Sequence, residues 1–227
     1  LFPSFPVTIS VKTNGFRFFN ILREYIKESK AIRFDGDSYG EAWEKEAKKR
    51  GLSNNKTTPE ALKVKITKRV IDLFEEMEVM NKIELEARYE IELELYTKRV
   101  QIESRVLGDI ARNHIVPTAI IYQNTLLENT KNIKEIFGDD FKNIAKEQIE
   151  LIMIISNHIT EINSLVNKMI DQRKKANTLS GLKSSEDYCH KVKPFFEQIR
   201  YHCDKLETMV DDNLWPLTKY RELLFTK

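Results

Sequence analysis

Glycine and proline are scarce in this sequence, with 7 Gly and 6 Pro among 227 residues. Tight turns and phosphate-binding loops depend on glycine, so the shortage argues against a loop-rich catalytic domain. The composition that remains, 41% hydrophobic and 32% charged, is typical of long amphipathic helices. The sequence therefore predicts an all-α fold, and its length allows a buried core without disulfide or metal staples.

The short motifs that carry nucleotide or nucleophile chemistry are also missing. The sequence contains no G-x-x-x-x-G-K-[ST] and no G-x-G-x-x-G, and it shows no recognisable Ser/His/Asp arrangement. We therefore expect no catalytic, cofactor-binding or metal-binding residue in this chain.

Cysteine is nearly absent, and the two cysteines, Cys189 and Cys203, lie fourteen residues apart in a segment with helical character. At about 1.5 Å per residue they would stand roughly 21 Å apart on one helix. A disulfide needs Cα atoms within about 7 Å, so these two cannot pair with each other. Free thiols are typical of a reducing compartment, and we expect a cytoplasmic protein.

No charge of one sign dominates, because 37 Lys and Arg face 35 Asp and Glu, for a net charge of +2. Such a balance creates no general field for nucleic acid or anionic lipid, so neither is expected as a partner. No apolar run approaches the roughly 18 to 20 residues that span a bilayer, and no signal peptide is recognisable. The chain opens on Leu1 rather than Met, which suggests a piece of a longer protein.

A metal site is not expected from the histidines, since no two show the i, i+3 or i+4 spacing that puts two ligands on one helix face. A zinc site from the pairs Cys189–His190 and His202–Cys203 fails on distance on a continuous helix, where they would be at least about 18 Å apart. Pro194 could break that helix. The four histidines are His114, His158, His190 and His202.

Three charged segments also have ordinary structural interpretations. Nine carboxylates against four basic residues between Glu75 and Glu103 favour a solvated face or a docking surface for a basic partner, because a di-iron bundle needs Glu-x-x-His pairs. The residues Asp35, Asp37 and Glu41 lack the twelve-residue calcium-loop spacing and favour a capping loop. The cluster Arg173–Lys175 lies near a predicted helix C-terminus, where cations offset the helix dipole.

The N-terminal region is predicted to be irregular. Residues 1–15 contain a strand-like segment, Val7–Val11, and the turn pair Asn14–Gly15, and we interpret them as an extended arm or junction. Apolar residues at helical spacing then predict a helix from Phe16 to Ser29.

Short helices are expected to continue to residue 81. A loop over residues 34–40 precedes a short charged helix, Glu41 to Arg50, which Gly51 ends. Thr58–Pro59 is typical of an N-cap followed by proline at the first helical position.

The stretch from Ile83 to Leu95 alternates between apolar and polar residues, as a half-buried strand does. Glu, Leu, Ala and Arg are nevertheless strong helix formers, and neither Gly nor Pro occurs between Pro59 and Gly108. A helix accommodates the alternation as two adjacent stripes, so we predict one long helix buried on a broad face. One stripe is Leu85, Tyr89, Leu93, Tyr96 and Val100, and the other is Ile83, Ala87, Ile91 and Leu95.

The chain is predicted to end in an antiparallel bundle of three long helices over residues 82–227, preceded by the short-helix region 16–81. The first runs from about Lys82 to Phe137 and is kinked or broken by Pro117. The second runs from about Asp140 to Asn177, and the third, capped by Ser184 or Ser185, runs to about Asp212. A short tail helix starting at Trp215–Pro216 should fold back onto the bundle with Trp215 as its anchor.

Several segments together resemble the C-terminal region of type III glutamine synthetases, over roughly residues 16 to 227. The final motif is the most distinctive of them. The segments are Ile32–Tyr39 with Trp43, Glu46–Leu52, Ala87–Ile91 with Tyr96, Val210–Asp212, Leu214–Leu217 and Lys219–Phe225.

The resemblance implies a parent enzyme that joins ammonia to glutamate with ATP and magnesium, assembled as stacked hexameric rings. The family's ATP, metal and glutamate residues lie upstream in a β-rich catalytic domain, so none is carried over to this chain. The role expected here is structural, assembly or regulatory, with the catalytic domain and sister subunits as partners. Two alternatives are a free-standing helical adaptor and a truncated paralogue that regulates the full enzyme.

Overall fold

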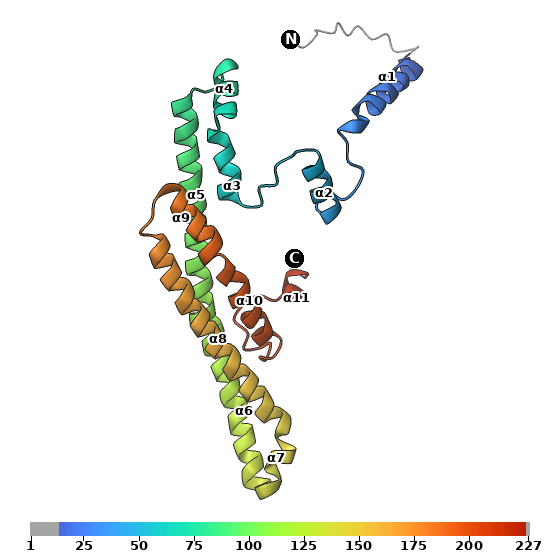
Figure 1. The fold of residues 1–227 in the computed structure, drawn as a ribbon. Helices are drawn as coiled ribbons and strands as arrows, with labels where there is room; N and C mark the ends of the chain where they lie inside the picture. The colour runs from blue at the N-terminus through green and yellow to red at the C-terminus, as the bar shows by residue number, and fades with distance from the viewer. Residues whose placement is uncertain (1–13, 226–227) are drawn as a thin grey trace. The chain divides into compact units, whose positions relative to one another are not determined.

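The computed structural model describes residues 14–225, and all of their regular secondary structure is helical (Figure 1). The predicted all-α fold is therefore confirmed. The arm predicted for residues 1–15 lies almost wholly outside the described residues. Its last two residues, Asn14 and Gly15, form the first turn of a helix instead of the expected turn, since Asn is also favoured at helix starts. The chain divides into two compact units, residues 1–55 and residues 56–227.

The first unit contains α1 (Asn14–Glu28), the 3₁₀ turn η1 (Ser29–Ala31) and α2 (Glu41–Lys49). Both α-helices were predicted. Gly51 ends the second helix region with φ of 73°, a left-handed conformation that glycine adopts without a Cβ clash. The loop between the helices is stabilised by the ring contact of Phe34 with Trp43, whose centroids lie 4.9 Å apart.

The second unit begins with α3 (Thr58–Lys63), the 3₁₀ turn η2 (Val64–Ile66) and α4 (Lys68–Glu76). The N-cap of α3 is Thr57, one residue before the predicted Thr58, and proline follows in the first turn. The helix α3 and the turn η2 contact the first long helix, α5. Leu62 of α3 joins Tyr89 and Leu93 of α5 in a small core.

The predicted first long helix is present as α5 (Lys82–Asp109), a π-helical segment η3 (Ile110–Ile115) and α6 (Val116–Phe137). A capping box starts it, because Asn81 Oδ1 accepts from the Glu84 amide at 3.0 Å and Glu84 accepts from the Asn81 amide at 2.8 Å. Pro117 lies in the first turn of α6 and is accommodated by the wider turn of η3, which ends two residues before it. Pro117 has no N–H to donate, so one backbone hydrogen bond of the helix is lost there. The sequence left open whether the helix would kink or break, and the structure shows that it continues through a locally wider turn.

The two predicted stripes of α5 have different surroundings. Leu85, Tyr89, Leu93 and Val100 are buried, as expected, with Leu93 only 2% exposed. The second stripe is exposed, with Ile91 at 56%. The prediction of one broad buried face is therefore wrong, because the neighbouring helices cover only one side of α5.

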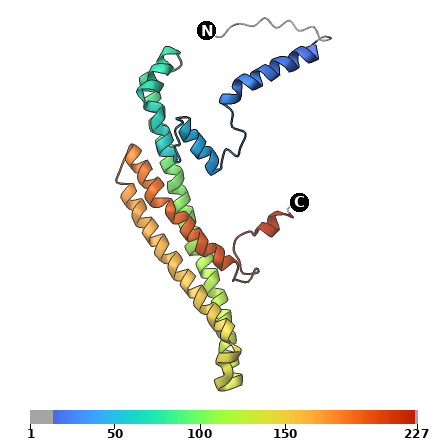
Figure 2. The same cartoon turned by 45° about the vertical axis from the view of Figure 1, so that its right-hand side comes forward.

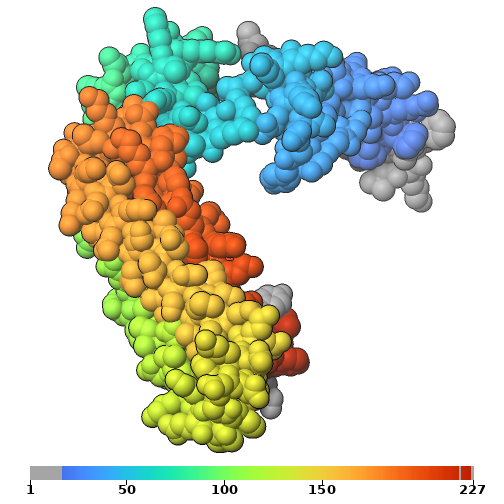
Figure 3. All heavy atoms as spheres, turned by 60° about the horizontal axis from the view of Figure 1, so that its bottom comes forward, coloured from blue at the N-terminus to red at the C-terminus, as the bar shows by residue number. Residues whose placement is uncertain are grey.

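The second long helix is α8 (Lys146–Ala176), which runs antiparallel to α6 (Figure 2). The turn between them uses η4 (Gly138–Asp140) and a four-residue helix, α7 (Phe141–Ile144), so the regular helix begins later than the predicted Asp140. Ile155, Ile162 and Val166 of the predicted apolar face are buried. In the space-filling view, α8 lies along the α5–α6 column (Figure 3).

The third long helix is divided into α9 (Gly181–Asp187), the π-helical segment η5 (Tyr188–Val192) and α10 (Pro194–Glu207). As at Pro117, a π-helical turn precedes the proline. The N-cap is Ser180, and the proposed caps Ser184 and Ser185 are instead buried inside the helix. The caps were misassigned because Gly181, with φ of 53°, begins the helix where a loop was expected.

The main core lies where α5–η3–α6, α8 and η5–α10 meet. Its fully buried side chains include Ile155, Ile162, Met169, Tyr188 and Ile199, all 0% exposed. The three-helix antiparallel bundle is thereby confirmed for the second unit.

In the tail as far as residue 225, helix is confined to one turn, α11 (Tyr220–Leu223), and the predicted start at Trp215–Pro216 lies in the preceding loop. Trp215 is half-buried and packs against the main core, as the anchor prediction required. Asp212 forms ion pairs with Lys219 and Arg221. Lys219 also donates to the Glu207 carbonyl at 3.2 Å, so these contacts tie the tail to the end of α10.

Candidate functional site

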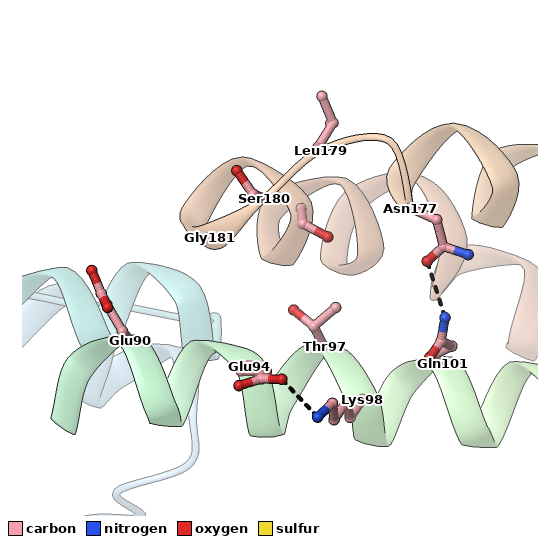
Figure 4. Close-up of a pocket in the computed structure, with 10 residues that line it drawn as sticks. Glu90, Glu94, Thr97, Lys98, Gln101, Asn177, Leu179, Ser180 and Gly181 are labelled. Carbon is pink, nitrogen blue, oxygen red and sulfur yellow. Dashed lines mark hydrogen bonds and ion pairs between the residues drawn. The ribbon is translucent and has the colours of Figure 1, made fainter. Parts of the chain in front are cut away.

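A shallow depression lies between α5 and the turn that joins α8 to α9 (Figure 4). It has a volume of about 560 Å³. Its lining residues are Glu90, Glu94, Thr97, Lys98 and Gln101 of α5, with Asn177, Leu179, Ser180, Gly181 and Ser184 of the turn and α9.

The polar groups of this depression are bound to one another. Gln101 Nε2 donates to Asn177 Oδ1 at 3.0 Å, and the Tyr188 hydroxyl donates to the same oxygen at 2.6 Å. Lys98 is paired with Glu94 at 2.6 Å, as Figure 4 shows. The Gln101–Asn177 bond joins the turn to α5, the Tyr188–Asn177 bond joins it to η5, and the Glu94–Lys98 pair lies within α5. The first of these contacts fastens the α8–α9 turn to the first long helix.

Two buried hydroxyls strengthen the same junction. Ser184 Oγ donates to the Ala176 carbonyl at 3.1 Å, which ties α9 to the end of α8. Ser185 Oγ lies 3.2 Å from the Leu93 carbonyl and 2.9 Å from Thr97 Oγ1. Burial of a hydroxyl is unfavourable unless it is hydrogen-bonded, and both of these groups are satisfied.

Four histidines were considered as metal ligands, and the structure brings two of them together. His158 of α8 and His202 of α10 place their Nδ1 atoms 2.8 Å apart. Burial lowers the pKa of His158, and the neighbouring His202 and Lys205 lower it further. Sequence reasoning missed the pair because its two residues lie 44 positions apart. The predicted antiparallel packing of the second and third long helices was the one feature of the sequence that could have brought them together.

The two cysteines weighed as zinc ligands also lie in separate helical segments. Cys189 lies in η5 and Cys203 in α10, and neither forms a disulfide. Burial, with a smaller contribution from Asp204, raises the pKa of the Cys203 thiol to about 12. Among residues 14–225, no group of three or more His, Cys, Asp or Glu side chains could hold a metal ion.

The remaining charged segments stabilise local structure. Asp37 accepts a hydrogen bond from the Tyr39 amide at 2.9 Å, which closes the loop before α2. In the acidic run, Glu84 caps α5, and Glu92 pairs with Lys65 at 2.6 Å. The basic cluster Arg173–Lys175 occupies the last turn of α8, where it offsets the helix dipole as predicted. None of the helices in the described region is long and apolar enough to cross a membrane.

The family model for the glutamine synthetase C-terminal domain matches residues 17–134, slightly more than half of the chain. This chain belongs to the glutamine synthetase C-terminal domain family. The resemblance seen in the sequence is thereby confirmed.

Three relatives extend this match over nearly the whole chain. A glutamine synthetase of Bacteroides fragilis is 47% identical over 211 residues, covering 92% of this chain and 29% of that protein. A type-3 glutamine synthetase of Dictyostelium discoideum is 29% identical over 96% of this chain and 30% of its own length. A glutamine synthetase of Butyrivibrio fibrisolvens is 26% identical over 91% of this chain and 29% of its own length. The chain thus spans about 30% of the length of these relatives.

Proposed function

We propose that this chain is the helical C-terminal domain of a type III glutamine synthetase and supplies structure and subunit contacts to an enzyme that joins ammonia to glutamate. The observation that carries the proposal is the similarity over 92% of this chain to a protein of which it covers only 29%. The remaining length of such an enzyme would hold the catalytic residues. The partners would be that catalytic part and sister subunits in stacked rings, in the cytoplasm.

The described residues do not fit ATP or magnesium, the groups that the reaction requires. Among residues 14–225 no group of three or more His, Cys, Asp or Glu side chains could hold the metal ion. The depression beside α5 presents the carboxylates Glu90 and Glu94, and Lys98 is already paired. A triphosphate is polyanionic and would be repelled by such a lining. We therefore assign nucleotide and metal binding to the catalytic part of the enzyme and derive no chemical step from this chain.

The first unit supports a contact role. α1 has apolar residues at spacings of three and four, and they are exposed: Phe18 and Phe19 at 61%, Tyr25 at 58% and Ile26 at 52%. A 15-residue helix is marginal in water unless an apolar face is packed. We infer that this face of α1 packs against the catalytic part of the enzyme.

The free-standing adaptor is not favoured by the comparisons, since the similarity to glutamine synthetases covers nearly all of the chain. A regulatory paralogue would share this similarity. It differs from the proposed domain in one respect, because it would not restore function when joined to a catalytic part.

A chimera tests the proposal. In the glutamine synthetase of Bacteroides fragilis, the segment similar to this chain is replaced by residues 1–227, and ligase activity and particle mass are measured. The proposal predicts an active, assembled chimera and loss of assembly when the segment is deleted. Leu93→Asp, at a side chain 2% exposed, should also abolish assembly, whereas Lys131→Asp, on the exposed side of α6, should not. If the enzyme that lacks this segment kept its ligase activity and its assembled state, the proposed role would be refuted.

A further inference from the structure

A row of exposed apolar side chains runs along α5 on the side away from the core. We call it the outer stripe, and it consists of Ile91, Leu95, Ile102 and Val106, which are 56%, 49%, 60% and 50% exposed. At about 100° per residue these four positions lie within about 60° of one another, roughly opposite Leu93 and Val100. The outer stripe is therefore a second apolar face on a helix that already buries its first.

The outer stripe continues onto a neighbouring helix. Ile102 and Val106 line a shallow apolar groove together with Leu107, Ile110 and the α10 residue Phe196. Contiguous exposed apolar side chains rimmed by polar residues are a feature of interaction sites.

The spacing of the outer stripe is the same in both directions, with steps of four, seven and four residues. An antiparallel copy of the same helix would consequently place Ile91 opposite Val106 and Leu95 opposite Ile102. The two-fold axis would pass between Lys98 and Arg99. A two-fold contact needs one self-complementary surface, and this spacing provides it.

An opposite-charge pair at each end of the outer stripe favours the same register, in which like charges face each other only nearer the axis, Lys98 opposite Arg99 and Glu94 opposite Glu103. With the axis between Lys98 and Arg99, Arg88 of one chain faces Asp109 of the other. Within residues 14–225 neither Arg88 nor Asp109 has an ion-pair partner. Asp109 Oδ1 accepts a hydrogen bond from Asn113 Nδ2, which leaves Oδ2 for Arg88 of the other chain. A parallel copy would instead place Arg88 against Arg88.

The residues around the axis are electrically balanced. Lys98 and Arg99 of two chains bring four positive charges together, and Glu94 and Glu103 of two chains bring four negative charges. Glu94 already lies 2.6 Å from Lys98 in one chain. The like charges near the axis are therefore compensated by carboxylates on both flanks.

We propose that the outer stripe binds its own counterpart in a second copy of this chain, antiparallel, with the two-fold axis between Lys98 and Arg99. The inference goes beyond the proposed function and does not rest on it, since a free-standing chain would pair in the same way. The stripe is only about 22 Å long, shorter than a standard interface, so the dissociation constant is expected to be micromolar.

Sedimentation of the full 227-residue chain over about 1 to 500 µM tests the pairing. The wild type should change from monomer to dimer, and Leu95→Asp should stay monomeric. Leu127→Asp is the matched control, because Leu127 is 48% exposed on α6 and lies outside the stripe; it should dimerise like the wild type. Circular dichroism establishes that each variant is folded.

A charge exchange tests the register. Arg88→Asp alone and Asp109→Arg alone should each weaken the dimer by about tenfold, since each creates two like-charge contacts across the axis. The double variant should regain wild-type affinity, because positions 88 and 109 again carry opposite charges, with the two signs exchanged. A wild type that stays monomeric at every concentration, a dimer that tolerates Leu95→Asp, or a double variant no tighter than the singles would overturn the proposal.

Discussion

His158 and His202 share a hydrogen bond between their Nδ1 atoms, at 2.8 Å, that joins α8 to α10. One Nδ1 donates a proton and the other accepts it, so the bond requires that one of the two Nδ1 atoms carry no proton. If both rings are protonated, both nitrogens become donors and the bond is lost.

Acidification should therefore weaken the bundle through this pair. The pKa of His158 is lowered in the folded chain by burial, His202 and Lys205, whereas the unfolded value is about 6.5. Its contribution to stability is present above about pH 6.5 and is lost as the pH falls through the lower folded pKa. Urea unfolding at about pH 7.5 and about pH 5.5 measures the difference.

The control variants isolate the pair. His158→Phe should lose less stability on acidification than the wild type, and His114→Phe, at an exposed position of η3, should lose as much as the wild type. Equal pH dependence in all three proteins would show that the His158–His202 bond does not couple protonation to folding.

The two stripes of α5 should differ sharply in their effect on stability. Leu93→Ala removes a side chain that is 2% exposed, and a loss of about 3 kcal/mol is expected from the cavity and the lost burial. Leu95→Ala, at 49% exposure, should change the free energy of unfolding by less than about 0.5 kcal/mol when measured on the monomer. Similar losses at both positions would place the second stripe in the core.

The two thiols should react at very different rates. The pKa of Cys203 is raised to about 12 and the side chain is 7% exposed, so its reactive thiolate is almost absent at neutral pH. Cys189 is only partly buried. An aromatic disulfide reagent should modify one thiol in the folded chain and the second only in denaturant. Rapid modification of Cys203 in Cys189→Ser would contradict this burial.

Trp215 should report the docking of the tail. With Trp43→Phe as background it is the only tryptophan, and blue-shifted emission that resists acrylamide is expected because it packs on the main core. Trp215→Ala should cost about 2 kcal/mol, less than for a fully buried aromatic. Trp215→Phe should cost little, since the indole Nε1 is buried without a partner. Red, freely quenched emission would show that the tail does not pack within this chain.

Much of the bundle could be predicted because helical periodicity is a local property of the sequence. The stripe Leu85, Tyr89, Leu93 and Val100 identified a helix despite the period-two pattern, and these side chains are buried. The exposure of Ile91 and Leu95 could not be predicted. It depends on which side of α5 the neighbouring helices cover, and this is decided by tertiary packing.

The details at prolines and polar groups depend on three-dimensional context. Pro117 predicted a disturbance, but whether a kink or a π-helical turn absorbs it depends on the packing of η3 against α8 and α10. Ser184 and Ser185 resembled caps in the sequence, and only the junction with α5 and α8 gives their hydroxyls buried partners. The His158–His202 pair required the register of two antiparallel helices.

A ligase assay of the purified 227-residue chain tests the central claim most directly. The chain is supplied with glutamate, ammonia, ATP and magnesium, and both glutamine formation and ADP release are measured beside an intact glutamine synthetase. If this is a structural domain of such an enzyme, neither product should exceed the protein-free background. Magnesium-dependent glutamine formation by the pure chain would contradict the assignment of catalysis to another part of the enzyme.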